Sequence, residues 1–97
     1  MLTVSEIKKT VEPIAKSSNI SKLILFGSYA EGTATSNSDI DLFVVTNGVT
    51  GFAFFEIKAR LEDAFSAEID LIPDIDVIPN SPIDEQIKKT GVTIYEE

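Results

Sequence analysis

The sequence predicts a single small α/β (α+β) domain, built on a mixed β-sheet that is flanked by helices. Segments with the apolar spacing of helices alternate along the chain with short apolar runs that are typical of strands. The chain has 97 residues, which is the size of one domain. Residues 1–97 are therefore expected to fold around one core.

The first two predicted elements are a helix and a strand. Residues 3–17 have apolar side chains on one helical face, and Thr3 and Glu6 have the spacing of a capping box. Pro13 is expected to kink this helix or to mark a break near its end. Residues 22–26 form an apolar run, which predicts a buried strand.

The middle of the chain contains a short helix, a loop and a second strand. Residues 28–31 predict the helix, and residues 32–38 are a polar loop of small side chains. Residues 39–46 begin with alternating polar and apolar positions and continue as an apolar run, which predicts the strand. Asn47 and Gly48 are typical of the turn that follows.

The next segment predicts a long helix and a third strand. Residues 52–65 carry an apolar stripe at helical spacing, in which Lys58 is polar. Residues 68–72 predict the strand, which Pro73 ends, and residues 74–80 are expected to form a loop.

The C-terminal segment predicts a last helix and an edge strand. Ser81 is the expected cap and Pro82 the expected first helical residue, because proline is favoured at that position. Gly91 is expected to stop the helix. Residues 92–95 are then expected to form the last strand.

Composition excludes several classes of function. Cysteine and histidine are absent from the sequence, which excludes disulfides, thiolate metal sites and Ser-His nucleophiles. The net charge of −8 disfavours direct binding to nucleic acid and suits a basic partner or simply solubility. The apolar runs are too short to span a membrane and a signal-peptide pattern is missing, so a cytoplasmic protein is expected.

Three aspartates are the candidate catalytic and metal-binding residues. Asp39 and Asp41 occupy alternate positions of a predicted strand, so both side chains are expected on one face. Asp70 lies between two apolar positions of the third strand, where a charge is unusual. Carboxylates of this kind suit Mg²⁺, and a pair of ions could clamp a phosphoryl transfer. In the alternative, Asp39 bonds nearby backbone amides and Asp70 merely faces solvent on an edge strand.

Gly27 and Ser28 are the candidate phosphate-binding residues. Glycine lets the backbone approach a phosphate closely, and the start of the following helix offers N–H groups to an anion. The alternative is that Ser28 caps the helix, since Glu31 lies at capping-box spacing. Gly32 is expected only to end that helix.

Gly27-Ser28 followed by Asp39, Asp41 and then Asp70 resembles the signature of minimal nucleotidyltransferase (MNT) domains of the DNA polymerase β superfamily. The similarity covers about half of the chain. It implies a nucleotidyltransferase fold, two Mg²⁺ ions (or Mn²⁺) at the three aspartates, and nucleotide phosphates at the Gly-Ser turn. The implied reaction transfers a nucleoside monophosphate, AMP from ATP, to an acceptor hydroxyl.

The resemblance also implies a partner. Small stand-alone members of this family often act as antitoxins beside a HEPN-domain toxin, and some add AMP to a tyrosine of that toxin. This chain departs from the family at Glu31, where members commonly have arginine, so activity is weakened or a lysine elsewhere compensates. Two other functions stay open: a noncatalytic acidic module that neutralises a basic partner by contact, and nucleotidyl transfer to a small molecule.

Overall fold

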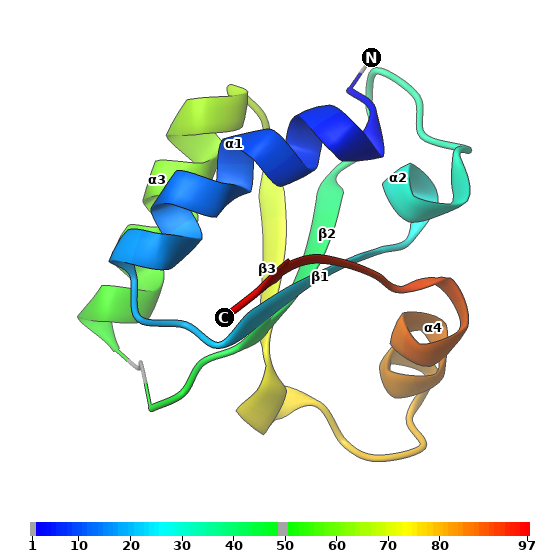
Figure 1. Ribbon diagram of the computed structural model, residues 1–97. Helices are drawn as coiled ribbons and strands as arrows, with labels where there is room; N and C mark the ends of the chain where they lie inside the picture. The colour runs from blue at the N-terminus through cyan, green and yellow to red at the C-terminus, as the bar shows by residue number, and fades with distance from the viewer. Residues whose placement is uncertain (1, 49–50) are drawn as a thin grey trace.

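The computed structural model, which describes residues 2–48 and 51–97, has one four-stranded sheet with helices packed on it (Figure 1). This is the fold class that the sequence predicts. The elements in chain order are α1 (Val4–Ser17), β1 (Lys22–Phe26), α2 (Ser28–Glu31), β2 (Ile40–Val45), α3 (Phe52–Phe65), β3 (Ile69–Pro73), the 3₁₀ helix η1 (Asp74–Asp76), α4 (Pro82–Thr90) and β4 (Val92–Glu96).

The sheet is mixed, as predicted, with the strand order β3-β2-β1-β4. β1 pairs antiparallel with β2 and with β4, whereas β2 and β3 are parallel. A parallel pair needs a crossover connection, and α3 provides it. The crossover makes β3 one edge of the sheet and leaves β4 at the other.

The core lies between one face of the sheet and two helices. α1 and α3 lie side by side over that face (Figure 1). Alternate strand residues point into this layer, and each fully buried Leu or Ile contributes about 1.5–3 kcal/mol. The buried side chains include Ile7, Val11, Ala15, Leu23, Leu25, Ile40, Leu42, Val44, Ile57, Leu61, Ile69, Leu71 and Ile94.

The first helix begins as predicted. Thr3 Oγ1 accepts from the N–H of Glu6 at 3.1 Å, and Glu6 Oε1 accepts from the N–H of Thr3 at 2.9 Å. Of the two expectations for Pro13, the break is wrong, because the helix continues to Ser17, and the kink stays a prediction. Its last turn still contributes Ala15 to the core.

The remaining boundaries differ little from the prediction. β2 begins at Ile40, so Asp39 precedes the strand, and β3 ends at Pro73. The predicted loop after β3 contains η1, in which Asp74 Oδ1 accepts from the N–H and hydroxyl of Thr46 at 3.2 and 3.0 Å. In the two described stretches, every helix is too short or too polar to cross a bilayer.

Candidate active site

Two of the three predicted aspartates lie side by side on neighbouring strands. Asp41 of β2 and Asp70 of β3 are register partners in the parallel pair, and such strands lie about 4.8 Å apart. Their sequence neighbours Ile40, Leu42 and Ile69 are buried in the core. Because side chains alternate along a strand, both carboxylates point to the face opposite α1 and α3. Asp70 therefore lies beside Asp41 on the neighbouring strand, and its side chain is exposed on an edge strand, as the alternative interpretation expected. Its role as a third metal ligand stays a prediction.

Asp39 lies in the loop before β2, one residue outside the strand that was predicted to contain it. The loop forms a small turn, in which Ser38 Oγ accepts from the N–H of Thr35 at 2.9 Å and the Ser38 N–H donates to the Thr35 carbonyl at 3.0 Å. The alternative role of Asp39 was to bond the backbone amides of this turn, and the side chain of Ser38 makes that bond instead. The Asp39 side chain is exposed.

Gly27 brings the backbone against the Asp41 carboxylate. It follows β1, with φ 73° and ψ −150°, in a region that favours glycine. A Cβ atom built on Gly27 would overlap with Asp41 Oδ2, an approach closer than real Cβ atoms show. Phe26 and Asp41 are register partners, so the β1–β2 pairing holds this approach. Glycine is required here because any larger residue would displace the carboxylate.

Ser28 is the first residue of α2, and Gly27 is its N-cap without a side-chain cap bond. The capping-box alternative for Ser28 and Glu31 is therefore wrong. A capping box needs the serine at the N-cap, but Ser28 lies one position after it. The Glu31 N–H donates to the Gly27 carbonyl at 3.0 Å and not to the Ser28 side chain. Gly32 ends the helix at φ 77°, as predicted. The Ser28 hydroxyl is left for a role other than capping.

The aspartates repel one another. Burial raises the pKa of Asp41 to about 6, and the charges of Asp70 and Asp39 add to the effect. A hard divalent cation prefers carboxylate oxygens as ligands, and its charge would relieve this repulsion. Within residues 2–48 and 51–97, however, no three acidic side chains form a ready metal-binding group. The three carboxylates are suitable ligands for a cation, although in the described residues their side chains are too far apart to bind a single ion together.

A hollow of about 420 Å³ lies beside this row of aspartates. It is lined by Asp39, Lys58, Glu62, Glu68, Ile69 and Asp70. Lys58 comes from α3 and is half-buried, and it is the basic residue of a lining that otherwise has four acidic residues and Ile69. The sequence signal for this residue is its place as the polar member of an apolar stripe. Glu31, at the end of α2, is exposed and does not line the hollow.

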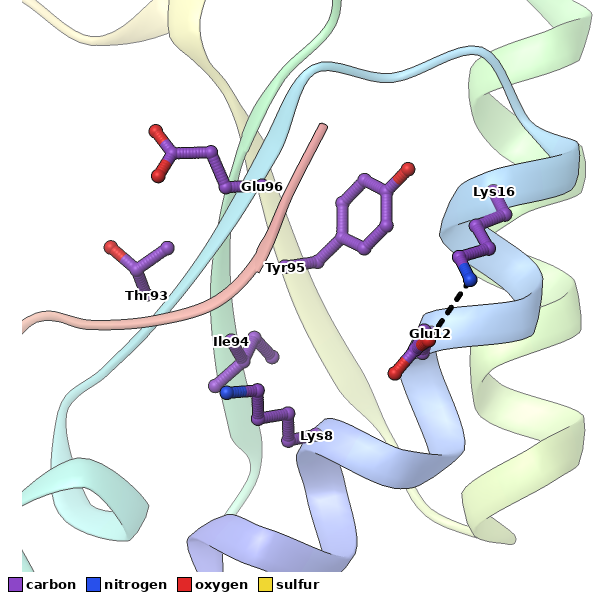
Figure 2. Close-up of a pocket in the computed structure, with 7 residues that line it drawn as sticks. All are labelled: Lys8, Glu12, Lys16, Thr93, Ile94, Tyr95 and Glu96. Atoms are coloured by element: carbon purple, nitrogen blue, oxygen red, sulfur yellow. Dashed lines mark ion pairs between the residues drawn. The ribbon is translucent and has the colours of Figure 1, made fainter.

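Another hollow, of about 380 Å³, lies between α1 and β4 (Figure 2). Lys8 and Lys16 reach over it from α1, and the ring of Tyr95 points toward that helix. Lys16 is paired with Glu12 at 3.0 Å. β4 and β3 are opposite edges of the sheet, so this hollow is remote from the aspartates.

Thr90 is a residue of the site that the sequence analysis missed. Its Oγ1 accepts from the N–H of Gly27 at 3.2 Å and donates to the carbonyl of Gln86 at 2.8 Å. Thr90 and Gly27 are separated by 63 positions in the sequence. No local pattern could have joined them, because the contact depends on how α4 returns to β1.

The chain is similar to several known proteins. The family model described as Polymerase beta, Nucleotidyltransferase matches residues 8–97. A "Putative protein adenylyltransferase" of Methanocaldococcus jannaschii is 32% identical over 77 residues, or 74% of this chain and 90% of that protein. The protein adenylyltransferase MntA of Shewanella oneidensis is 40% identical over 58 residues, or 56% of this chain and 42% of that protein.

A solved complex also contains a similar fold. It is the complex of tri-AMPylated Shewanella oneidensis HEPN toxin with MNT antitoxin. The match has a TM-score of 0.73 at 17% identity and covers 98% of this chain and 74% of that chain.

Proposed function

Since this chain belongs to the polymerase β family of nucleotidyltransferases, we propose that it transfers AMP from ATP to a tyrosine hydroxyl of a HEPN-type partner protein, as the antitoxin of a toxin–antitoxin pair. The relatives named above are protein adenylyltransferases, which supports a protein acceptor. The matched complex pairs an MNT antitoxin with an AMPylated HEPN toxin, which supports the class of partner.

The observation that carries the proposal is the parallel pairing of Asp41 with Asp70 beside the Gly27 turn. The turn leads into the first N–H groups of α2, which lack acceptors within the helix. Phosphate oxygens bound there lie next to the Asp41 carboxylate. Asp70 is one strand further away, at the hollow that Lys58 also lines. The acceptor hydroxyl enters from this side.

The reaction is a single displacement at phosphorus. The acceptor oxygen forms a bond to the α-phosphorus, and the bond from that phosphorus to the pyrophosphate oxygen breaks. The hydroxyl proton passes to the Asp70 carboxylate. Ser28 donates its hydroxyl hydrogen to a phosphate oxygen, and the Lys58 ammonium offsets part of the negative charge at the acceptor side.

Asp39, Asp41 and Asp70 would hold Mg²⁺ or Mn²⁺, in the two-ion arrangement common in phosphoryl transfer. A bound cation would neutralise charge on the phosphates and relieve the repulsion that raises the pKa of Asp41. The net charge of −8 also suits a partner that is basic at the contact.

The test is mass spectrometry of the partner after co-expression with the product of the neighbouring gene. The expected result is a stable complex in which a partner tyrosine carries AMP. Asp39→Asn should abolish the added mass while the complex still forms. The matched control is Asp63→Asn, which removes the same charge from an exposed position of α3 outside the site.

The experiment also distinguishes the other functions. If the wild type and Asp39→Asn neutralise the toxicity of the partner equally well, and the partner carries no added nucleotide, the protein is a noncatalytic binding module instead. AMP transfer to an aminoglycoside or another small molecule, with an unmodified partner, would reassign the acceptor.

A further inference from the structure

The hydroxyl of Thr90 connects the C-terminal end of α4 to the turn after β1. Thr90 Oγ1 donates its hydrogen to the Gln86 carbonyl at 2.8 Å, so its lone pairs are free to accept from the Gly27 N–H at 3.2 Å. A threonine hydroxyl that bonds the carbonyl four residues earlier is held in one rotamer. The acceptor presented to Gly27 is therefore fixed in direction.

The two backbone polar groups of Gly27 are both in use. Its N–H donates to Thr90, and its carbonyl accepts from the Glu31 N–H at 3.0 Å. Gly27 is buried and has a φ of 73°. Because glycine can adopt many backbone conformations, these two hydrogen bonds fix the orientation of its peptide groups. The Cα of the same residue lies against Asp41 Oδ2.

The end of α4 is itself held firmly on β1. Gly91 follows Thr90, and its N–H donates to the Ile87 carbonyl at 2.8 Å. A Cβ atom on Gly91 would lie 2.8 Å from the Ile24 side chain, so helix and strand are in close contact at this point. Ile87 is buried beneath the helix. The position of Thr90 is therefore fixed by the packing of α4 on β1.

We infer that Thr90 is a positioning residue for nucleotide binding: by accepting from the Gly27 N–H it holds the Gly27-Ser28 turn in the orientation that the proposed phosphate site needs and keeps the backbone against Asp41. This inference rests on the proposed nucleotide site. Thr90 touches neither phosphate nor metal itself. Its loss acts through the orientation of Gly27.

The test compares three variants by calorimetric titration with Mg–ATP, well below the unfolding temperature. Thr90→Val keeps the shape but removes the acceptor, and it should weaken binding about fivefold to tenfold. Thr90→Ser keeps the hydroxyl and should stay within about twofold of the wild type. Thr10→Val is the matched control, because Thr10 Oγ1 bonds the Glu6 carbonyl at 2.9 Å in the same way but lies on α1 away from the site.

A role limited to stability would lower the unfolding temperature of Thr90→Val and leave its ATP affinity unchanged. That result, or a Thr90→Ser variant as weak as Thr90→Val, would overturn the inference. The amide proton resonance of Gly27 gives a second measurement. It should shift upfield in Thr90→Val only, and an unmoved resonance would overturn the contact itself. If the wild type binds no Mg–ATP, the proposed function fails and this inference fails with it.

Discussion

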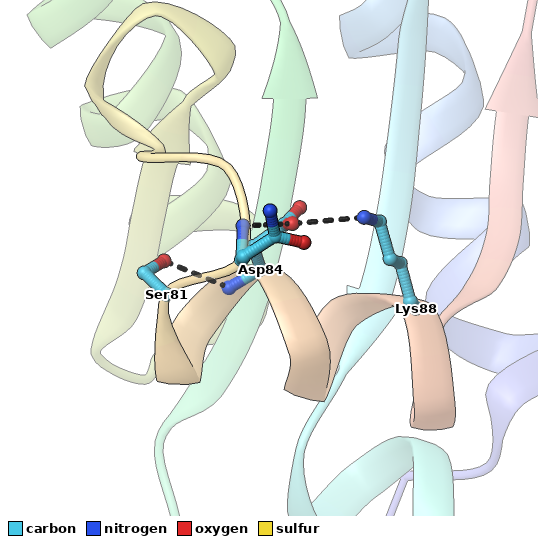
Figure 3. Close-up of polar contacts among 4 residues, drawn as sticks. Ser81, Asp84 and Lys88 are labelled. Carbon is cyan, nitrogen blue, oxygen red and sulfur yellow. Dashed lines mark hydrogen bonds and ion pairs between the residues drawn. The ribbon is translucent and has the colours of Figure 1, made fainter.

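The N-terminal ends of α2 and α4 satisfy their polar groups in opposite ways. At α4, Ser81 Oγ accepts from the Asp84 N–H at 3.2 Å, and Asp84 Oδ2 accepts from the Asn80 N–H at 2.8 Å and lies 2.9 Å from Lys88 Nζ (Figure 3). At α2, the N-cap is Gly27, which makes no side-chain cap bond. The carboxylate next to it, Asp41, faces another carboxylate and not a donor.

The pKa values record this difference. The Asn80 hydrogen bond, with Lys88, holds the pKa of Asp84 below its usual value. Burial and neighbouring charges raise the pKa of Asp41 to about 6. The contacts at the start of α4 therefore stabilise the fold, whereas the repulsion around Asp41, beside the start of α2, lowers stability until it is relieved. Four predictions follow from this contrast, in order of expected effect.

Asp41→Asn and Asp84→Asn should separate activity from stability. Asp41→Asn should lower AMP transfer by about a hundredfold or more, because it removes a ligand charge for the cation that would neutralise the phosphates. Its free energy of unfolding should be equal to that of the wild type or higher, since repulsion is relieved. Asp84→Asn should keep transfer and lose stability. Rates from labelled ATP and urea unfolding of both variants decide this, and a fully active Asp41→Asn would end the assignment.

Binding of Mg–ATP should stabilise the site around Gly27 and Asp41, where the carboxylates repel one another. At a hundredfold excess over its dissociation constant it should raise the free energy of unfolding by about 2.7 kcal/mol. Thermal unfolding with and without Mg–ATP measures this shift. Asp84→Asn should show the full shift and Asp41→Asn little of it. Equal shifts in the two variants would mean that the nucleotide binds elsewhere.

Ser28→Ala and Ser81→Ala form a matched pair of helix starts. Ser81→Ala removes a true cap and should cost about 1 kcal/mol of stability without changing nucleotide affinity. Ser28→Ala removes no cap bond, so stability should hold while ATP binding weakens by about 1.5–3 kcal/mol. Urea unfolding and calorimetric titration give the two quantities. A loss of stability in Ser28→Ala with normal affinity would restore capping as its role.

The pH dependence of stability should differ in sign for the two aspartates. The pKa of Asp41 is raised from 3.8 to about 6, so the folded state holds this proton more tightly, and its contribution to stability falls as pH rises through that interval. The pKa of Asp84 is lowered, so its contribution is present above pH 3.8 and is lost as pH falls further. Urea unfolding at about pH 4.5 and about pH 7 should show that the gain in stability of Asp41→Asn over the wild type is larger at the higher pH. An equal difference at both values would contradict the raised pKa.

Most secondary structure and the catalytic candidates followed from the sequence because they depend on local patterns. The range of α3 and the capping box of α1 were predicted to the residue. Asp41 and Asp70 were conspicuous because each interrupts an apolar strand. The errors were also local: Ser28 lies one position past the cap, and Asp39 one residue before its strand.

The arrangement of the site was decided by tertiary structure. That Asp41 pairs with Asp70 depends on the parallel crossover through α3, which brings together strands far apart in sequence. The contact of Thr90 with Gly27 and the place of Lys58 in the hollow depend on how helices return to the sheet. Residue spacing determines which side chains share a face of one element, because the period of a strand or helix is fixed. It does not determine which elements become neighbours, because burial of the whole core selects that arrangement.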